Sequence, residues 1–176
     1  MFKKIAFVVV VLVVALLAYA VTRPDTLHVQ RAASIMAPPE KIFPLISDFH
    51  SWTSWSPYEK RDPAMKRAYS GAVHGRGAVY EWDGNSEVGQ GRMEITDTSD
   101  PSRVTIKLDF IEPIEGHNVA EFALVPQGGA TNVTWSMDGP SPYIGKLIGV
   151  FINMDTMIGK DFETGLANLK ALAEKQ

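Results

Sequence analysis

Three side chains of the sequence are candidates for acid–base chemistry: Asp155, His50 and Tyr80. Asp155 follows Phe151 and precedes Ile158 on or beside an apolar stripe, so we expect its carboxylate to be desolvated and its pKa raised. The alternatives are that Asp155 bonds a loop amide or an arginine at the edge of the stripe, and that His50 lies on the surface. An enzyme would need these groups to converge in one cavity.

Other kinds of site find little support in the residues. The four histidines show no metal-ligand spacing, so no metal site is expected. The absence of cysteine excludes disulfides, thiolate metal centres and a thiol nucleophile, and no G-x-S-x-G motif supports a serine nucleophile. The glycines at 75–77 and 89–91 lead into strands rather than helices, which predicts turns and no phosphate site. We therefore expect no cofactor.

The composition predicts one globular domain and argues against a nucleic-acid partner. The chain has 176 residues, 45% of them hydrophobic, with 17 basic and 20 acidic side chains. Three of the basic residues, Lys3, Lys4 and Arg23, precede Pro24 and leave 14 against the 20 acidic ones in the rest of the chain. An acidic body repels a polyanion.

An uninterrupted apolar run from Ile5 to Val21 predicts a membrane helix. Residues 5–22 would span about 27 Å as a helix, which just covers a bilayer core. Lys3 and Lys4 before the run favour a cytoplasmic N-terminus. We therefore divide the chain into a signal anchor at 1–23 and an extracytoplasmic domain at 24–176, in a single-pass membrane protein.

A cleaved signal peptide is the alternative for the same segment. Ala18-Tyr19-Ala20 matches the small-x-small cleavage pattern after a basic and apolar stretch. Cleavage near Ala20 would leave a secreted or periplasmic protein.

The body begins with a strand and short helices. Leu27–Ile35 reads as a strand, and Pro38-Pro39-Glu40 marks the start of a helix that Pro44 keeps short or kinked. The stretch from Ser47 to Tyr58 spaces its aromatic residues by three, which favours a second short helix or a helical turn.

Six strands then follow without a helix between them, which predicts an antiparallel meander and excludes a parallel α/β fold. In the strands near Ile106, Phe122 and Trp135, apolar residues alternate with polar ones, so one face of the sheet is apolar. The predicted strands are Met65–Tyr69, Gly77–Trp82, Gly91–Thr96, Ser102–Ile111, Asn118–Val125 and Thr131–Met137.

Residues Tyr143–Lys175 repeat apolar side chains at helical spacing and predict a cover for that apolar face. One helix of this length measures about 45 Å, enough to cross every strand of a curved sheet. Any loosening of this helix is expected near Gly145, Gly149 or Gly159.

This order of elements resembles the SRPBCC superfamily, which includes START domains, the birch pollen allergen and polyketide cyclases/dehydrases. Three stretches carry the resemblance: Ile35–Phe43, Asp48–Pro57 and Gly159–Leu169. It covers residues 27–175 and implies an α+β helix-grip fold. That fold has a seven-stranded antiparallel curved sheet, two short helices and a long C-terminal helix, here preceded by the N-terminal transmembrane helix. The fold alone does not define an activity.

The resemblance further implies a cavity between the sheet and the long helix that takes apolar ligands. Apolar, aromatic and methionine side chains at inward positions are the candidate lining, with packing of the core as the alternative for each of them. They are Trp55, Tyr58, Tyr80, Trp82, Met93, Phe110, Phe122, Trp135, Phe151, Met154 and Ile158.

Three functional hypotheses follow. The first is a membrane-tethered, non-catalytic binding protein for a hydrophobic small molecule or lipid. The second is an enzyme of cyclase, dehydratase or hydrolase type, with Asp155, His50 or Tyr80 as acid–base groups. The third is a protein-interaction module with an exposed apolar patch, which the translocation signal disfavours.

Overall fold

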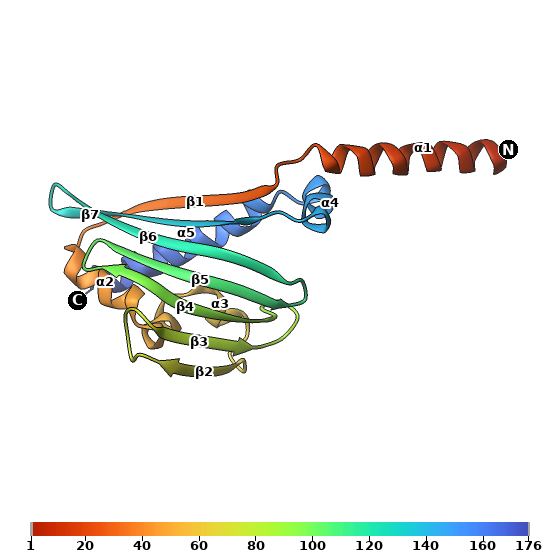
Figure 1. Ribbon diagram of the computed structural model, residues 1–176. Helices are drawn as coiled ribbons and strands as arrows, with labels where there is room; N and C mark the ends of the chain where they lie inside the picture. Colours follow the sequence, from red (N-terminus) through yellow and green to blue (C-terminus); the bar gives the residue numbers. More distant parts are fainter. Residues whose placement is uncertain (1, 176) are drawn as a thin grey trace.

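The computed structural model describes residues 2–175 as one curved sheet with helices on its concave face and a separate N-terminal helix (Figure 1). The strands are β1 (Thr26–Ile35), β2 (Lys66–Gly71), β3 (Ala78–Asp83), β4 (Gln90–Ser99), β5 (Arg103–Glu112), β6 (Gly116–Gln127) and β7 (Ala130–Pro140). The helices are α1 (Phe2–Val21), α2 (Pro39–Ser47), the 3-10 helix η1 (Phe49–Ser54), α3 (Pro57–Arg61), α4 (Tyr143–Phe151) and α5 (Met154–Ala173).

The sheet has the order β1-β7-β6-β5-β4-β3-β2, and every neighbouring pair is antiparallel. The predicted meander of six consecutive strands is therefore confirmed, with the first strand added beside the last. Short turns join the six strands, as hairpin connections do. One end of the sheet holds the start of β1, the end of β7 and the β5–β6 turn, and α1 leaves the domain from this end (Figure 1).

The alternation of apolar and polar residues assigned the sheet faces correctly. Ile106, Phe122 and Trp135 are all buried on the concave face, while Lys107 between the strand's apolar residues is exposed. Strand neighbours such as Phe122 and Trp135 stand directly opposite each other in the register. Side chains alternate between the two faces of a strand, so this pairing brings the apolar residues of all central strands into one layer.

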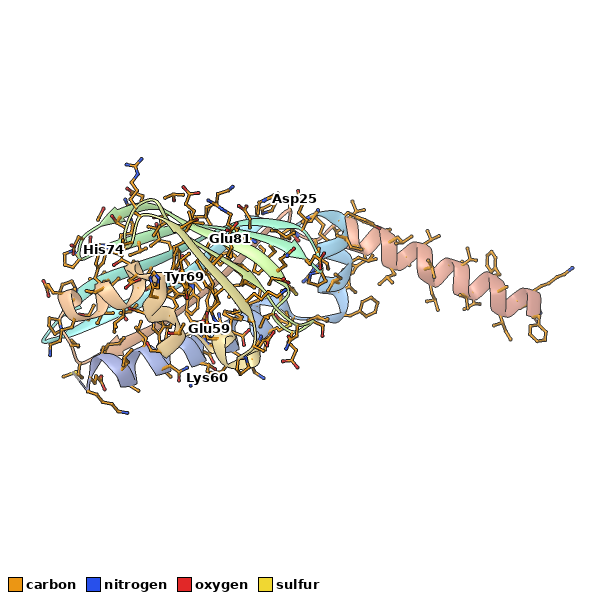
Figure 2. All side chains as sticks on the ribbon, turned by 90° about the horizontal axis from the view of Figure 1, so that it is seen from below. Asp25, Glu59, Lys60, Tyr69, His74 and Glu81 are labelled. Carbon is orange, nitrogen blue, oxygen red and sulfur yellow. The ribbon has the colours of Figure 1, made fainter. Side chains whose placement is uncertain are left out.

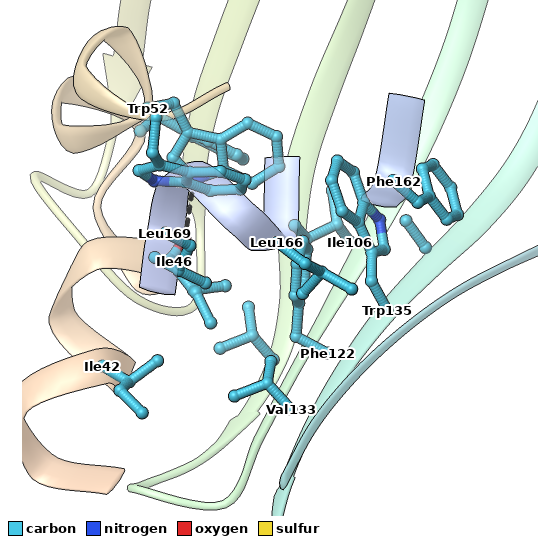
Figure 3. Close-up of a cluster of buried hydrophobic side chains, with 14 of the residues drawn as sticks. Ile42, Ile46, Trp52, Ile106, Phe122, Val133, Trp135, Phe162, Leu166 and Leu169 are labelled. Carbon is cyan, nitrogen blue, oxygen red and sulfur yellow. Dashed lines mark hydrogen bonds between the residues drawn. The ribbon is translucent and has the colours of Figure 1, made fainter. Parts of the chain in front are cut away.

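Aromatic rings pack together with aliphatic side chains in the layer between sheet and helices (Figure 3). The indole of Trp135 is sandwiched between Phe122, with ring centroids 4.8 Å apart, and Phe162 of α5, at 4.1 Å and 8° between planes. Trp52 and Trp55 meet the same rings edge-on. Stacked and edge-to-face contacts of this kind add to the free energy gained by burying the rings.

Three short helical elements stand where two were predicted. Asp48 ends α2 and caps η1 by accepting a hydrogen bond from the His50 amide, which separates the two elements. The indoles of Trp52 and Trp55 donate to the carbonyls of Ile46 and Leu45, both at 2.9 Å. These bonds tie the short helices together and let two large polar-edged rings be buried.

The prediction of a single long C-terminal helix was wrong, because this segment forms two helices, α4 and α5. The break lies at Ile152 and Asn153, at none of the three glycines where loosening was expected. The Asn153 side chain caps α5 by accepting from the Thr156 amide at 3.0 Å. After the break, α5 lies along β1 at one edge of the sheet rather than across all seven strands, and α4 packs against α1.

Helix α1 extends away from the domain and touches it only near its C-terminal end (Figure 1). Ala20 is buried against the domain, and the Tyr143 hydroxyl donates to the Leu17 carbonyl at 3.2 Å. Within residues 2–175, α1 is the helix long and apolar enough to cross a membrane, and a signal sequence near an N-terminus passes the same test.

Candidate functional site

The structure places six of the eleven predicted lining residues in the packed core: Trp55, Tyr80, Trp82, Met93, Phe122 and Trp135. Tyr58, Phe110, Met154 and Ile158 are half-buried around it, and Phe151 is exposed. They point to the concave side of the sheet or flank it, but their rings largely contact each other there. The core-packing alternative thus describes most of the set.

The close packing of this core can be read from two glycines. A Cβ atom on Gly165 of α5 would lie 2.7 Å from Cζ3 of Trp135, and one on Gly91 of β4 would lie 2.3 Å from Cζ2 of Trp82. Neither position has room for a methyl group unless the indole moves. Helix α5 therefore meets the sheet directly at the Trp135 ring, and the Trp82 ring of β3 lies directly on the neighbouring strand β4.

One buried polar atom of this core is unused. The Nε1 of Trp135 is the buried side-chain nitrogen that, within residues 2–175, has no hydrogen-bond partner. A buried indole N–H usually finds an acceptor. Trp135 therefore owes its position to the contacts of its ring faces rather than to a hydrogen bond.

A hollow of about 550 Å³ lies beside the break between α4 and α5; we call it the junction hollow. One part of its wall is apolar and comes from Phe151, Ile152 and Met157. The full lining is Arg61, Phe151, Ile152, Asn153, Thr156, Met157, Lys160 and Asp161. Of the predicted lining residues, Phe151 takes part in it directly.

The other part of the wall carries charge. Arg61 of α3 forms an ion pair with Asp161 of α5 and lies over the Tyr58 ring, with its Cζ 5.3 Å from the centroid. Burial raises the pKa of the Tyr58 hydroxyl, and the nearby Asp161 carboxylate raises it further. The tyrosine therefore stays neutral. Of the two cations in the wall, Arg61 is paired with Asp161, and Lys160 is not.

A buried carboxylate that sequence reasoning missed lies on α3. Glu59 accepts a hydrogen bond from the Tyr80 hydroxyl at 2.7 Å and an ion-pair bond from Nε of Arg67, also at 2.7 Å. Figure 2 shows Glu59 close to Tyr69, which stacks beside Tyr80 at 5.2 Å between centroids. Tyr80 was a candidate lining residue of the interior, and the need of its buried hydroxyl for a partner was the available signal.

Glu59, Tyr80 and Arg67 form one buried hydrogen-bond cluster, which we call the Glu59 cluster. Burial raises the pKa of Tyr80, and the hydrogen bond to the Glu59 carboxylate raises it further. Both oxygens of Glu59 are occupied, one by Tyr80 and one by Arg67. A carboxylate with a fixed cation and a fixed donor stabilises α3 against β2 and β3, and Glu59 lines neither the junction hollow nor a smaller hollow next to β2.

The expected desolvation of Asp155 was wrong. Its side chain is exposed, and the Arg31 guanidinium holds the pKa of the carboxyl below its ordinary value through two hydrogen bonds. This is the arginine alternative weighed for this residue. The helix break is the physical reason, because α5 starts afresh at Asn153 and turns Asp155 toward the edge strand β1.

His50 lies apart from the other candidates. Its exposed ring stacks on Tyr69 at 4.1 Å between centroids and bonds Asp48 at 3.0 Å. Both rings border a second, smaller hollow of about 330 Å³ next to β2 and the β2–β3 turn. His50, Tyr80 and Asp155 thus have three different sets of partners, and the structure does not bring them together as an acid–base site.

No group of three or more histidine, aspartate or glutamate side chains suited to a metal ion occurs in residues 2–175.

Comparison with protein families finds one match over nearly the whole body of the chain. Residues 26–174 match the model of a family described as polyketide cyclase/dehydrase and lipid transport. The matched range starts at β1 and ends after α5, and it leaves out α1. No curated protein matches the sequence.

Solved structures share the fold at low sequence identity. Protein CV1439 from Chromobacterium violaceum aligns with a TM-score of 0.60 at 15% identity, over 86% of this chain and 99% of its own. Ara h 8.0201 aligns with a TM-score of 0.59 at 12% identity, over 86% and 99%. DynU16, from the dynemicin biosynthetic locus, gives 0.60 at 14% identity, over 86% of this chain and 48% of its own.

Proposed function

Because the chain belongs to the polyketide cyclase/dehydrase and lipid transport family, we propose that it is a membrane-tethered protein that binds a hydrophobic small molecule or lipid. The family description covers both binding and catalysis. The choice between them for this chain depends on where its hollow and its polar groups lie.

One observation carries the proposal: the α4–α5 segment joins the junction hollow to α1. Helix α4 packs against α1, and Phe151 at its end lines the hollow together with Ile152 and Met157. A ligand that dissolves in a bilayer is concentrated where α1 would be inserted. A tether at this point shortens the transfer distance and raises the effective concentration of such a ligand at the hollow.

We propose α1 as a single-pass anchor that places the domain on the extracytoplasmic side. Its 20 residues measure about 30 Å, the thickness of a hydrocarbon core. Lys3 and Lys4 lie at the end of α1 far from the domain, and basic residues stay on the cytoplasmic side. The mass of the mature protein in membranes tests this, since cleavage near Ala20 would remove the helix.

The two-sided wall of the junction hollow favours an amphiphile. Phe151, Ile152 and Met157 offer apolar contacts, while Lys160 and Thr156 offer donors in the same lining. A volume of about 550 Å³ falls in the range of small-molecule sites. The ligand class that fits is a molecule with an apolar body and a small polar or anionic end.

An enzyme remains the second candidate, on the strength of the buried Glu59 with its hydroxyl and guanidinium partners. The pKa of Tyr80 beside it is raised, and groups with shifted pKa values cluster at functional sites. Here, however, each oxygen of Glu59 already has a donor, and Asp155 and His50 bond other partners. The binding function is therefore the better supported of the two.

The experiment is native mass spectrometry of the full chain, purified from membranes in a mild detergent, with organic extraction of what it carries. We expect an apolar species bound to the wild type and lost in Met157→Lys, which puts a charge on the apolar wall. Met36→Lys makes the same change at another exposed methionine, beyond β1 at the end of the domain away from α1, and should keep the ligand. An empty wild type, or equal occupancy in both variants, would contradict the proposal.

A further inference from the structure

Exposed apolar side chains gather at the end of the domain from which α1 leaves. Outside α1, eleven large apolar residues are exposed within the described chain, and seven of them lie on α4, on the α4–α5 segment or around the β5–β6 turn. We call these seven the apolar rim: Ile111, Ile114, Tyr143, Ile144, Phe151, Ile152 and Met157. The remaining four, Met36, Val73, Val119 and Val125, lie elsewhere on the domain. A patch of this kind marks a surface that contacts an apolar partner.

The contact between α4 and α1 determines how close the apolar rim comes to a membrane. The Tyr143 hydroxyl bonds the Leu17 carbonyl, four residues before α1 ends at Val21. Four residues of helix measure about 6 Å. If α1 spans a bilayer, Tyr143 then reaches below the end of the apolar segment, at the depth where tyrosines are enriched.

Further contacts hold α4 in this place. The Lys146 ammonium forms an ion pair with Asp25 just before β1, and the Ser141 amide donates to the Asp25 carbonyl at 2.7 Å. Figure 2 shows Asp25 beside α1 and His74 at the opposite end of the domain. Only residues 22–25 separate α1 from β1, so the domain has little freedom to move away from the end of α1.

The composition of α4 suits the surface of a bilayer. Its nine residues read YIGKLIGVF, with Lys146 as the single charge, and none of them is buried in the domain. Phe151 is 73% exposed at its end. A short helix of this kind gains free energy by burying its apolar side chains between lipid headgroups and acyl chains.

We infer that the apolar rim lies in the lipid leaflet around α1 and forms the route by which a ligand passes between the bilayer and the junction hollow. Phe151, Ile152 and Met157 belong to both the rim and the hollow, so the two are continuous. The inference rests on the proposed function for the membrane anchor. It adds the partner surface, a lipid leaflet, and the direction from which the ligand enters.

The absence of cysteine makes the test direct, because a single cysteine can be introduced and labelled anywhere. Full-length Phe151→Cys and Ile144→Cys, each carrying a nitrobenzoxadiazole fluorophore, are reconstituted in phosphatidylcholine vesicles. The matched control is Val125→Cys, an exposed apolar position at the end of β6 far from α1, whose exposure lies between those of Ile144 and Phe151. At the two rim positions we expect blue-shifted emission and quenching by nitroxide-labelled lipid. For Val125→Cys we expect neither effect.

The outcomes separate this inference from the proposed function. Rim labels that emit as in water, like the control, would overturn the inference even if mass spectrometry finds a bound ligand. Rim labels quenched by lipid in a protein that carries no ligand would support the placement of the rim in the leaflet, and would contradict both the binding function and the ligand route. Labels that are shielded without lipid quenching would place a second copy of the chain on the rim and overturn the inference.

Discussion

Arg31 on β1 forms a bidentate ion pair with Asp155 in the first turn of α5, in which Nη1 donates to Oδ1 and Nη2 donates to Oδ2, each at 3.0 Å. The same Nη2 also donates to the Asp155 carbonyl at 3.0 Å, and Nε donates to Glu163 at 2.9 Å. Arg31 thus links the edge strand to the first and third turns of the helix. Arg31 thereby fixes the start of α5, next to the junction hollow, against β1.

Replacing Arg31 should loosen the start of α5 more than replacing Asp155. Arg31→Met removes every one of these bonds, whereas Asp155→Asn leaves the bonds to Glu163 and to the main-chain carbonyl. Hydrogen exchange of the amides in residues 156–163, followed by mass spectrometry, should be fastest in Arg31→Met and intermediate in Asp155→Asn. Lys66→Met, which breaks an exposed pair with Asp83 on β2, is the control and should match the wild type. Equal exchange in all four proteins would disprove the role of Arg31.

Gly165 should be intolerant of any side chain. An added Cβ would meet the Trp135 ring at 2.7 Å and Pro57 at 3.2 Å, so we expect Gly165→Ala to lower the free energy of unfolding by about 1–3 kcal/mol. Gly149→Ala on α4 meets no atom within 4 Å and should leave it unchanged or raise it by up to about 1 kcal/mol. Chemical denaturation of the full chain in detergent measures both, and a neutral Gly165→Ala would show that helix and sheet are less closely packed here.

Tyr80 should be a stabilising residue rather than a catalytic one. Tyr80→Phe removes a buried hydrogen bond to a charged carboxylate, which is worth about 1.5–3 kcal/mol. Tyr69→Phe, on the neighbouring half-buried ring, removes a hydroxyl that forms no hydrogen bond within residues 2–175 and should change the free energy of unfolding by less than about 0.5 kcal/mol. Both variants should retain the bound ligand in native mass spectra. Unaltered stability of Tyr80→Phe would instead favour an active role for this hydroxyl.

The outer face of the sheet should make stability depend on pH through His117. Its hydrogen bond to Asp109, 2.7 Å long, raises the pKa of His117, and Glu115 at 3.4 Å adds to the effect while Lys107 opposes it. A raised pKa in the folded state means that the stabilisation is complete below the ordinary histidine value of about 6.5 and is lost as the pH rises through the folded value. An NMR titration should show the His117 midpoint above that ordinary value and a lower midpoint in Asp109→Asn. An identical midpoint in the two proteins would rule out the pairing.

The strands and their faces could be predicted because alternation is a local pattern. In the strands of Ile106, Phe122 and Trp135 the apolar residues recur at every second position, and in a half-buried strand such residues all lie on the buried face. The break between α4 and α5 could not be predicted in this way, because the apolar spacing continues through Phe151 and Ile152. Asn153 is compatible with a helix interior and becomes a cap only when α4 turns toward α1.

The positions of the polar residues Glu59 and Asp155 could not be predicted from local sequence patterns either, because they depend on contacts between distant parts of the chain. Glu59 is buried because Arg67 and Tyr80, from two other strands, reach it, and no spacing in the sequence records that meeting. Asp155 was assigned to a buried stripe on the assumption of one continuous helix. Because the helix is broken before Met154, the Asp155 side chain faces Arg31 on β1 instead. The junction hollow exists only because of the same break, so its lining could not be foreseen beyond Phe151.

The central claim, that the junction hollow takes an apolar ligand, is tested most directly by photo-cross-linking. A fatty acid with a diazirine at the end of its chain is added to the full-length protein in phosphatidylcholine vesicles, irradiated, and located by peptide mass spectrometry. We predict cross-links on residues 151–160 and on the α3 peptide with Arg61, which are competed away by unlabelled fatty acid. Cross-links confined to α1, or spread evenly to Val73 and Val125 at the opposite end, would contradict the account.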